Sequence, residues 1–287
     1  MNDRVLRLAV PNKGRLMDPT TELLKESGLE FERSGRALSA HVHNVDLDLL
    51  FVRADDIPEL IADEVADLGI TGQDLLAEYE TALPELVTLG YGKCSLVAAV
   101  PNASAATKID DLAGLTVASA HPHVTERFFA DRNIEVTLVP LKGSVEVAPK
   151  LGVADAIVDL VSTGSTMLVN GLRPVDTLLV SQAVLVGSTA AMADRAGEID
   201  RVVMALNAVA SARRKRYLLL NAPAAAVSAI TEIIPGLSAP TVVSLADPGM
   251  VAVHSVVDSD AVWNLLPGLK AAGGRDILVL PIGQMIT

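Results

Sequence analysis

Hydroxyl side chains and a glycine gather in one short segment, Asp159-Leu-Val-Ser-Thr-Gly-Ser-Thr-Met167. The apolar residues at its start predict a buried strand, which runs into a loop that opens a helix. Ser162, Thr163 and Thr166 supply hydroxyl groups, and the backbone around Gly164 supplies N–H groups. Such a loop suits a phosphate, because the N–H groups point outward and the helix dipole favours an anion. An ordinary junction, with Ser and Thr as helix caps, explains the same residues.

Cations lie at the ends of two other predicted strands. Lys13 and Arg15 follow the first strand, and Arg53 ends the second. An arginine fork and a lysine point charge both bind pyrophosphate or triphosphate. The alternatives are a solvated turn for the first pair and, for Arg53, an ion pair with Asp55-Asp56.

Two carboxylates are candidates for binding a ribose diol or Mg²⁺, and a third lies at the start of a predicted helix. Asp155 and Asp159 stand on one predicted strand, and Asp155 could instead only cap the start of that strand. Glu146 begins a predicted helix after Gly143-Ser144, where the helix dipole stabilises a negative charge. Thr71-Gly72-Gln73-Asp74 forms another strand-to-helix loop, which we expect to hold a nucleotide unless Thr71 is only a cap.

Composition narrows the class of protein. The 287 residues are half hydrophobic and carry a net charge of −12, which disfavours nucleic-acid and membrane-surface binding. Anionic ligands must therefore be held by local cations, backbone N–H groups or metal ions. No apolar run is long enough to span a bilayer, and the N-terminus lacks a signal-peptide core. Cys94 is the only cysteine, so no intrachain disulfide can form and we expect a cytoplasmic location.

Strand-like and helix-like segments alternate over the first two thirds of the chain, which predicts open parallel sheets with ligands at the strand ends. A composition shift at 101–114 predicts the crossover between two α/β lobes. The segments 86–101 and 176–187 are each expected to be a strand, 144–151 a helix, and 196–216 a long helix ending in basic residues. We interpret this basic end as favourable charge at a helix C-terminus, not as a nucleic-acid patch.

The last third has a different pattern. Strands are predicted at 217–222, 241–246, 250–257 and 277–282, with helices at 224–234 and 261–272. Asp247-Pro-Gly249 predicts a hairpin turn between the middle strands. The order βαββαβ predicts a small ferredoxin-like module.

The window 146–167 as a whole resembles the signature of the ATP phosphoribosyltransferase family, the first enzymes of histidine biosynthesis. PNKGRL (11–16), VRADDIPEL (52–60), DLGITGQDLL (67–76) and LKGSVEVAP (141–149) are similar to the same family. The C-terminal third resembles the regulatory domain of the long form. The matching positions in the window are Glu146, Gly152, Ala154, Ile157, Asp159, Leu160, Thr163, Gly164, Thr166 and Met167.

The resemblance implies two periplasmic-binding-protein-like lobes around a catalytic cleft, plus a ferredoxin-like regulatory domain. We place lobe I at 1–98 and 182–212, lobe II with the loop for phosphoribosyl pyrophosphate (PRPP) at 99–181, and the regulatory domain at 213–287. The implied reaction transfers phosphoribosyl from PRPP to N1 of ATP, with Mg²⁺ as cofactor, releasing pyrophosphate. No protein base is needed, because N1 can attack the anomeric carbon directly with inversion.

The resemblance also implies roles for individual residues. The family more often has Tyr where this chain has His121, so the imidazole could stack on adenine in its place, or be an ordinary loop histidine. The implied catalytic residues are Arg53, Lys13 and Arg15. PRPP is assigned to Asp155, Asp159, Ser162, Thr163, Gly164, Ser165 and Thr166, and the nucleotide to Arg36, Thr71, Gly72, Asp74, His121 and Glu146. Glu146 and Asp159 are the implied metal ligands, and Asn221, Leu237, Thr241, Asp247, Val256 and Asp276 the implied allosteric histidine site.

The family implies histidine and AMP as inhibitors and a homo-oligomer built from dimers into a hexamer. Two rival interpretations stay open at the level of sequence. One is a non-catalytic anion-binding protein of the same two-lobed fold, and the other is a silent subunit that regulates a partner.

Overall fold

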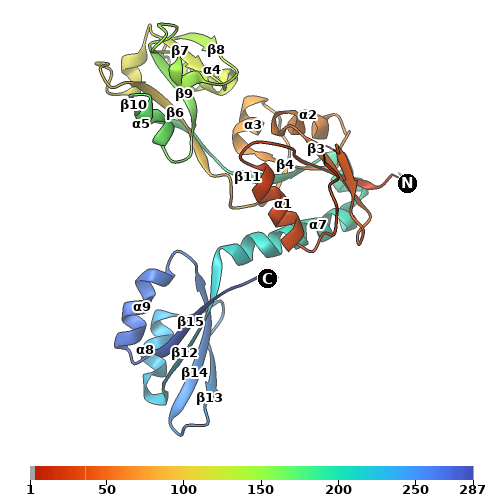
Figure 1. Cartoon of the computed structure of the whole chain (residues 1–287), viewed down its shortest axis with the longest axis vertical. Coiled ribbons are helices and arrows are strands. Elements are labelled where there is room, and N and C mark those ends of the chain that lie inside the picture. Colours follow the sequence, from red (N-terminus) through yellow and green to blue (C-terminus); the bar gives the residue numbers. More distant parts are fainter. Residues whose placement is uncertain (1–3, 36, 287) are drawn as a thin grey trace. The chain divides into compact units, whose positions relative to one another are not determined.

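The structure, a computed structural model, describes residues 4–35 and 37–286 (Figure 1). The chain forms two compact units. The first ends at Val203, and the second runs from Met204 and also takes in Leu23–Gly28. Within the described ranges, none of the helices is long and apolar enough to cross a membrane.

A six-stranded sheet of order β2-β3-β1-β4-β11-β5 forms lobe I of the first unit. Its central strands are apolar at almost every position, as expected of strands covered on both faces. β1 pairs in parallel with β3 and β4, so the loops after these strands meet at one edge of the sheet. The strands are β1 (Leu6–Pro11), β2 (Ser39–His41), β3 (Leu47–Val52), β4 (Leu68–Gly72), β5 (Glu85–Thr88) and β11 (Ala183–Gly187), and the helices α1 (Met17–Glu26), α2 (Ile57–Ala62), α3 (Gln73–Glu78) and α6 (Thr189–Asp194).

A five-stranded sheet of order β10-β6-β9-β7-β8 forms lobe II. β7 pairs in parallel with β8 and β9, whereas β6 pairs antiparallel to β9 and β10. Phe128 and Phe129 pack against this sheet with Leu96, Val117 and Val158. The elements are β6 (Cys94–Pro101), β7 (Thr116–Ser119), β8 (Thr137–Pro140), β9 (Ala156–Val161), β10 (Leu172–Ser181), α4 (Pro122–Ala130) and α5 (Ser165–Val169).

The chain passes between the two sheets twice, which is the two-lobe organisation that the resemblance implies. The first passage lies between β5 and β6, and the second at Gln182, between β10 and β11. The crossover predicted at 101–114 is therefore wrong, because this segment lies within lobe II. The boundary placed at 98–99 falls inside β6 and moves to the 89–93 connection. The segments 86–101 and 176–187, each expected to be a strand, both divide between the sheets.

The second unit contains a four-stranded antiparallel sheet of order β13-β14-β12-β15, with α8 and α9 on one face (Figure 1). Leu218, Leu220, Val253 and Leu269 form part of the core between helices and sheet. The βαββαβ order of the sequence-based prediction is confirmed. The elements are α7 (Ala196–Arg213), β12 (Lys215–Pro223), α8 (Val227–Ile233), β13 (Thr241–Ser244), β14 (Met250–Asp258), α9 (Val262–Ala271) and β15 (Arg275–Pro281).

Two predicted helices are shorter than expected. The helix at 144–151 is only a 3-10 turn at Val145–Val147, since Ser144 is left-handed (φ 51°) and Pro149 follows. The helix at 196–216 ends at Arg213. Of the basic residues there, Arg213 pairs with Glu26 and Lys215 with Asp258, so they serve contacts within the protein.

Candidate active site

A cavity of about 270 Å³ lies where the loops after β1, β3 and β4 meet the edge of lobe II. Three cations, Lys13, Arg15 and Arg53, line it, although the chain as a whole is acidic. Ligands of open α/β sheets bind at this end of the strands. The remaining lining residues are Gly14, Leu16, Ala54, Asp55, Asp74, Leu75, His121 and Leu160.

Arg15 is held in place by lobe I. Its Nη2 lies 2.9 and 3.0 Å from the two carboxylate oxygens of Asp74, and its Nη1 donates to the carbonyl oxygen of Gly92. Of the two side chains in the pair, Arg15 is 32% exposed and Asp74 1%. The guanidinium is therefore oriented by a buried partner while one side of it still borders the cavity.

Asp74 is the most buried charge of the site. Ser181 Oγ donates to its carboxylate (2.5 Å) and accepts its backbone N–H (2.9 Å), and His121 Nε2 lies 3.6 Å away. Burial by itself raises the pKa of a carboxyl, but His121, Arg15 and Ser181 outweigh burial and lower the pKa of Asp74 to about 2. Asp74 thus faces protein groups, and the expectation that it binds the nucleotide changes to one of positioning Arg15.

Thr71 and Gly72 shape the turn into α3. Thr71 is fully buried and its hydroxyl donates to the carbonyl oxygen of Ala54 (3.2 Å), so it ties this turn to the loop after β3. Gly72, not Thr71, is the N-cap residue, and no side chain caps the helix there. A Cβ on Gly72 would collide with the Asp74 carboxylate and approach Arg15 Nη2. The capping interpretation of Thr71 is therefore wrong, and the glycine leaves room for the Asp74–Arg15 pair.

Lys13 and Arg53 are exposed, and within the described residues their charged groups make no hydrogen bond or ion pair. Arg53 follows β3 and precedes a 3-10 turn at Ala54–Asp56. The predicted alternative, an ion pair with Asp55-Asp56, is not formed. Both cations are therefore available to an anionic ligand.

The 162–166 loop, which the resemblance assigns to PRPP, follows β9, whose Leu160 lines the cavity. Gly164 is left-handed (φ 77°) and is the N-cap of α5, and no side chain caps that helix. The Ser and Thr residues are thus not the caps that the alternative interpretation supposed. Ser162, Thr163, Ser165 and Thr166 are exposed, and Thr163 Oγ1 lies 3.0 Å from Ser165 Oγ.

The three candidate carboxylates separate into two groups. Asp159 is half-buried and lies at the loop end of β9. Burial is the main cause that raises its pKa, and the neighbouring charge of Glu146 raises it further. Asp155 lies before the opposite end of β9, where it accepts the backbone N–H of Thr116 (2.9 Å). The structure therefore corrects the assignment of Asp155 to PRPP and supports its alternative as a cap at the start of the strand. In the part of the chain that the structure describes, no group of three His, Cys, Asp or Glu side chains could hold a metal ion alone.

His121 forms part of the cavity wall. It is 6% exposed, and its Nδ1 has no hydrogen-bond partner among the described residues. Its Nε2 lies 3.6 Å from a carboxylate oxygen of Asp74, so this edge of the ring faces that side chain. His123 is exposed in the first turn of α4. Arg36, the remaining nucleotide candidate, lies outside the described residues.

In the second unit, four of the six allosteric candidates share one region of the sheet. Asn221, Thr241 and Val256 point to the face that α8 and α9 leave uncovered, and Asn221 Nδ2 donates to Asp276 Oδ2 (3.1 Å). Leu237 is 55% exposed, so packing alone does not explain it. Asp247 is exposed in the hairpin turn.

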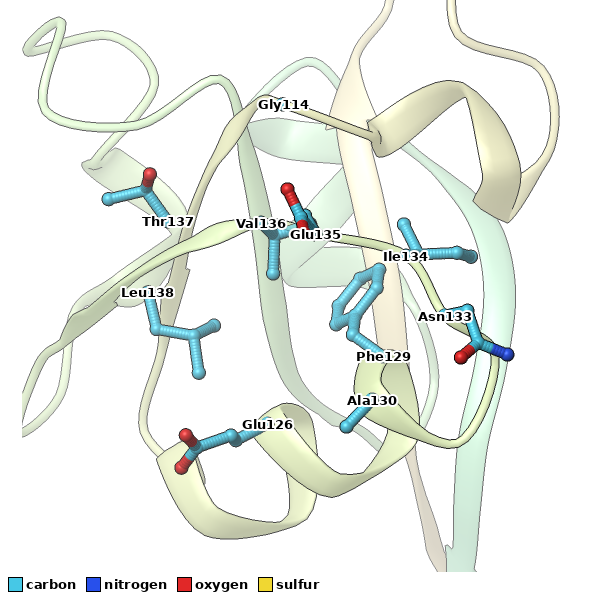
Figure 2. A pocket seen from close by; sticks show the side chains of 10 residues that line it. All are labelled: Gly114, Glu126, Phe129, Ala130, Asn133, Ile134, Glu135, Val136, Thr137 and Leu138. Atoms are coloured by element: carbon cyan, nitrogen blue, oxygen red, sulfur yellow. The ribbon is translucent and has the colours of Figure 1, made fainter.

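A larger hollow of about 750 Å³ lies beside α4 and β8 and contains none of the predicted site residues. Figure 2 shows the residues that line it, which include the two carboxylates of Glu126 and Glu135. Because no lysine or arginine lines it, this hollow does not suit a phosphate.

Sequence reasoning missed Ser181 and Glu78. Ser181 reaches Asp74 across 107 residues of chain, and the Glu78 carboxylate accepts backbone N–H groups of α4. Neither residue stands in a motif, so no sequence signal could have found them.

The fold and the cavity define a two-lobed α/β protein with a cation-lined site and a separate C-terminal sheet domain. Residues 53–208 match the family described as ATP phosphoribosyltransferase, and residues 212–284 match the family's C-terminal domain. The chain therefore belongs to the ATP phosphoribosyltransferase family, in its long form, and it catalyses the first step of histidine biosynthesis.

Individual relatives agree along nearly the whole chain. The ATP phosphoribosyltransferase of Gemmatimonas aurantiaca is 44% identical over 292 residues, covering 98% of this chain and 100% of the relative. That of Methanosarcina acetivorans is 40% identical over 289 residues, with the same coverage. The solved structure of the ATP phosphoribosyl transferase (HisG:HisZ) complex from Thermotoga maritima matches at TM-score 0.64 and 30% identity, covering 72% of this chain and 98% of that chain.

Proposed function

We propose that the cavity and the 162–166 loop hold the two substrates for transfer of phosphoribosyl from PRPP to N1 of ATP. The observation that carries this proposal is the convergence of Lys13, Arg15 and Arg53 on one cavity in a chain of net charge −12. Arg53 and Lys13 neutralise the departing pyrophosphate. The Ser162–Thr166 loop holds the 5′-phosphate through its exposed hydroxyls and backbone N–H groups.

Positioning and charge stabilisation carry the chemistry. N1 of adenine attacks the anomeric carbon with inversion, and pyrophosphate leaves toward the cations. The cavity of about 270 Å³ is small for two nucleotide-sized polyanions, so the lobes must open to admit them. Closure then excludes water and limits hydrolysis of PRPP.

Mg²⁺ fits a site shared between protein and substrate. Asp159 and Glu146 lie close enough for the charge of Glu146 to raise the pKa of Asp159, and magnesium commonly joins one or two carboxylates to substrate phosphates. When bound, the ion supplies charge neutralisation at the pyrophosphate. Asp159 and Glu146 would hold that ion together with the substrate phosphates, and they would orient the ribose diol.

The test of this function is the ultraviolet absorbance of an N1-alkylated adenine in a mixture of protein, ATP, PRPP and Mg²⁺, with pyrophosphatase added to pull the reaction forward. A rise that requires both substrates and the metal supports the proposal. A protein that binds ATP and PRPP without any rise would instead be a silent binding protein.

We place histidine inhibition in the second unit, at Asn221, Thr241, Val256 and Asp276, with Leu237 and Asp247 at its margin. Histidine carries an amine and a carboxylate, and the Asn221–Asp276 pair offers complementary polar groups on this face. AMP inhibits by competing for the nucleotide site. Histidine added to the same absorbance assay should suppress the rise, and an unaffected rate would exclude this assignment.

The uncovered sheet face also supports a homo-oligomer of dimers and hexamers. We define the open face as Tyr217, Leu219, Asn221, Thr241, Val243, His254, Val256, Leu278 and Leu280, which alternate along their strands away from the helix-covered core. Val243 is 48% and Leu278 54% exposed, and such an apolar patch marks an association surface. The biosynthetic role and the single cysteine support a cytoplasmic location.

A further inference from the structure

We infer that Glu78 is a positioning residue that caps α4 from the other lobe and thereby fixes His121 in the wall of the active-site cavity. Glu78 is the last residue of α3 in lobe I and is 7% exposed. Its Oε1 accepts the N–H of His123 (3.1 Å) and its Oε2 the N–H of Val124 (3.0 Å). Both donors belong to the first turn of α4 in lobe II.

The first turn of α4 needs this carboxylate. A helix leaves its first N–H groups without partners, and the side chain of the N-cap residue usually accepts from the second or third position. Here the N-cap residue is His121, and its side chain makes no such bond. His121 N–H donates to Ser119 Oγ (2.9 Å), and Pro122 has no N–H. Glu78 therefore satisfies the two donors that remain.

Because the Glu78 carboxylate caps α4, the side chain of His121 does not have to, and its ring can line the cavity. Because Glu78 accepts the N–H groups that an N-cap side chain would otherwise serve, the imidazole turns toward Asp74, 3.6 Å away. Asp74 and Glu78 stand four residues apart on α3 and so lie on one face of that helix. One short helix thus controls the Arg15 guanidinium, the His121 ring and the backbone that carries this ring. The link to ATP rests on the proposed function, in which the cavity that His121 lines holds the substrates.

A neighbouring contact supplies a matched control. Arg127, also on α4, pairs with Glu80 at 3.3 Å, but the two side chains are 47% and 64% exposed. An exposed pair of this kind contributes little. Arg127→Ala therefore removes a contact between the same two segments without disturbing the cap of α4.

The experiment compares Glu78→Ala, Glu78→Gln and Arg127→Ala in the full-length protein, by steady-state kinetics and by the imidazole NMR signal of His121. Loss of a buried cap should raise the KM for ATP about five- to tenfold, with the kcat and the KM for PRPP changed less than about twofold. The His121 signal should shift or broaden. Glu78→Gln keeps one acceptor oxygen and should give a smaller effect, and it serves as the test if Glu78→Ala does not fold. Arg127→Ala should leave both readouts as in the wild type.

Combination with His121→Ala separates this inference from the proposed function. If Glu78 acts through His121, adding Glu78→Ala to His121→Ala leaves the KM for ATP as in His121→Ala alone. The inference would be overturned if the increases in the KM for ATP of the two single variants multiply in the double variant. An unchanged His121 signal in the Glu78 variants would also overturn it. If His121→Ala itself leaves the KM for ATP unchanged, the nucleotide role of His121 fails, and the NMR signal alone then decides whether Glu78 positions the ring.

Discussion

At the scale of single residues, the site combines buried charges that are paired within the protein with exposed charges that have no partner among the described residues. Asp74 remains ionised at 1% exposure because Arg15, His121 and Ser181 surround its carboxylate. Arg53 has the opposite environment, since it is exposed and without a partner in the described chain. A buried charge of this kind orients its neighbours, whereas an exposed one is available to bind a ligand.

Asp74→Asn should flatten the acid dependence of folding stability. The pKa of Asp74 falls from 3.8 to about 2 on folding, so its charge stabilises the native state above about pH 4, and this contribution is lost as the pH falls toward 2. A shift of this size corresponds to about 2 kcal/mol. Urea unfolding over this pH range should show the wild type losing that much more free energy of unfolding than Asp74→Asn. Parallel curves for the two proteins would contradict the prediction.

Arg53→Ala should lower kcat about 100-fold, as removal of a single transition-state contact does, because the departing pyrophosphate loses a cation. The free energy of unfolding should change by no more than about 0.5 kcal/mol, since the side chain is exposed. Arg53→Lys, which keeps the charge but not the fork, should retain more activity than the alanine variant. Full activity of Arg53→Ala at an unchanged melting temperature would remove this residue from the mechanism.

At the scale of elements, parallel pairing of β1 with β3 and β4 brings the loops after these strands to one edge of the sheet. α3 then connects this edge to lobe II through both of its acidic side chains, Asp74 and Glu78. Gly72, at the start of α3, leaves the space that the first of these side chains occupies.

Gly72→Ala should lower kcat/KM and destabilise the fold by about 1–3 kcal/mol, the usual cost of overpacking. The φ of Gly72 is −93°, which alanine adopts freely, so the effect reports the collision with Asp74 and not backbone strain. Gly197→Ala, in α7, is the control, because a Cβ at that position would have nothing within 4 Å. That change should be neutral or stabilising by up to about 1 kcal/mol. Kinetics and thermal unfolding of both variants check the prediction, which fails if Gly72→Ala behaves like the control.

At the scale of the whole molecule, the proposed catalytic site and the proposed association surface belong to different units. The first unit holds the cavity, and the second holds a sheet with one face covered by its own helices and one left open. A separate domain with an exposed apolar face suits contact with a second copy of the chain.

Leu278→Glu should shift the protein toward smaller species in analytical ultracentrifugation while its circular dichroism stays unchanged. A charge on the open face must be desolvated when a second copy binds, but it costs little on an exposed strand of the separate subunit. Trp263→Gln, 82% exposed on α9 of the helix-covered side, is the control and should sediment like the wild type. Equal sedimentation of both variants would exclude the open face as the interface.

The sequence by itself determined the family and most strands and helices, and it predicted the Ser162–Thr166 loop as a phosphate site. These features follow from residues that are close together in the sequence. Examples are the alternating βα segments, the βαββαβ pattern and a loop such as Ser162–Thr166. Local patterns also placed Lys13, Arg15 and Arg53 at strand ends, where the structure gathers them around one cavity.

Only the tertiary structure decided what these residues contact. Strand periodicity alone could not show that Asp155 and Asp159 serve opposite ends of β9. Nor could local sequence show that the chain leaves lobe I before β6, that Ser181 bonds to Asp74, or that Glu78 caps a helix of the other lobe. The physical reason is that hydrogen bonds and ion pairs depend on distances in space, and pairing of distant segments fixes those distances.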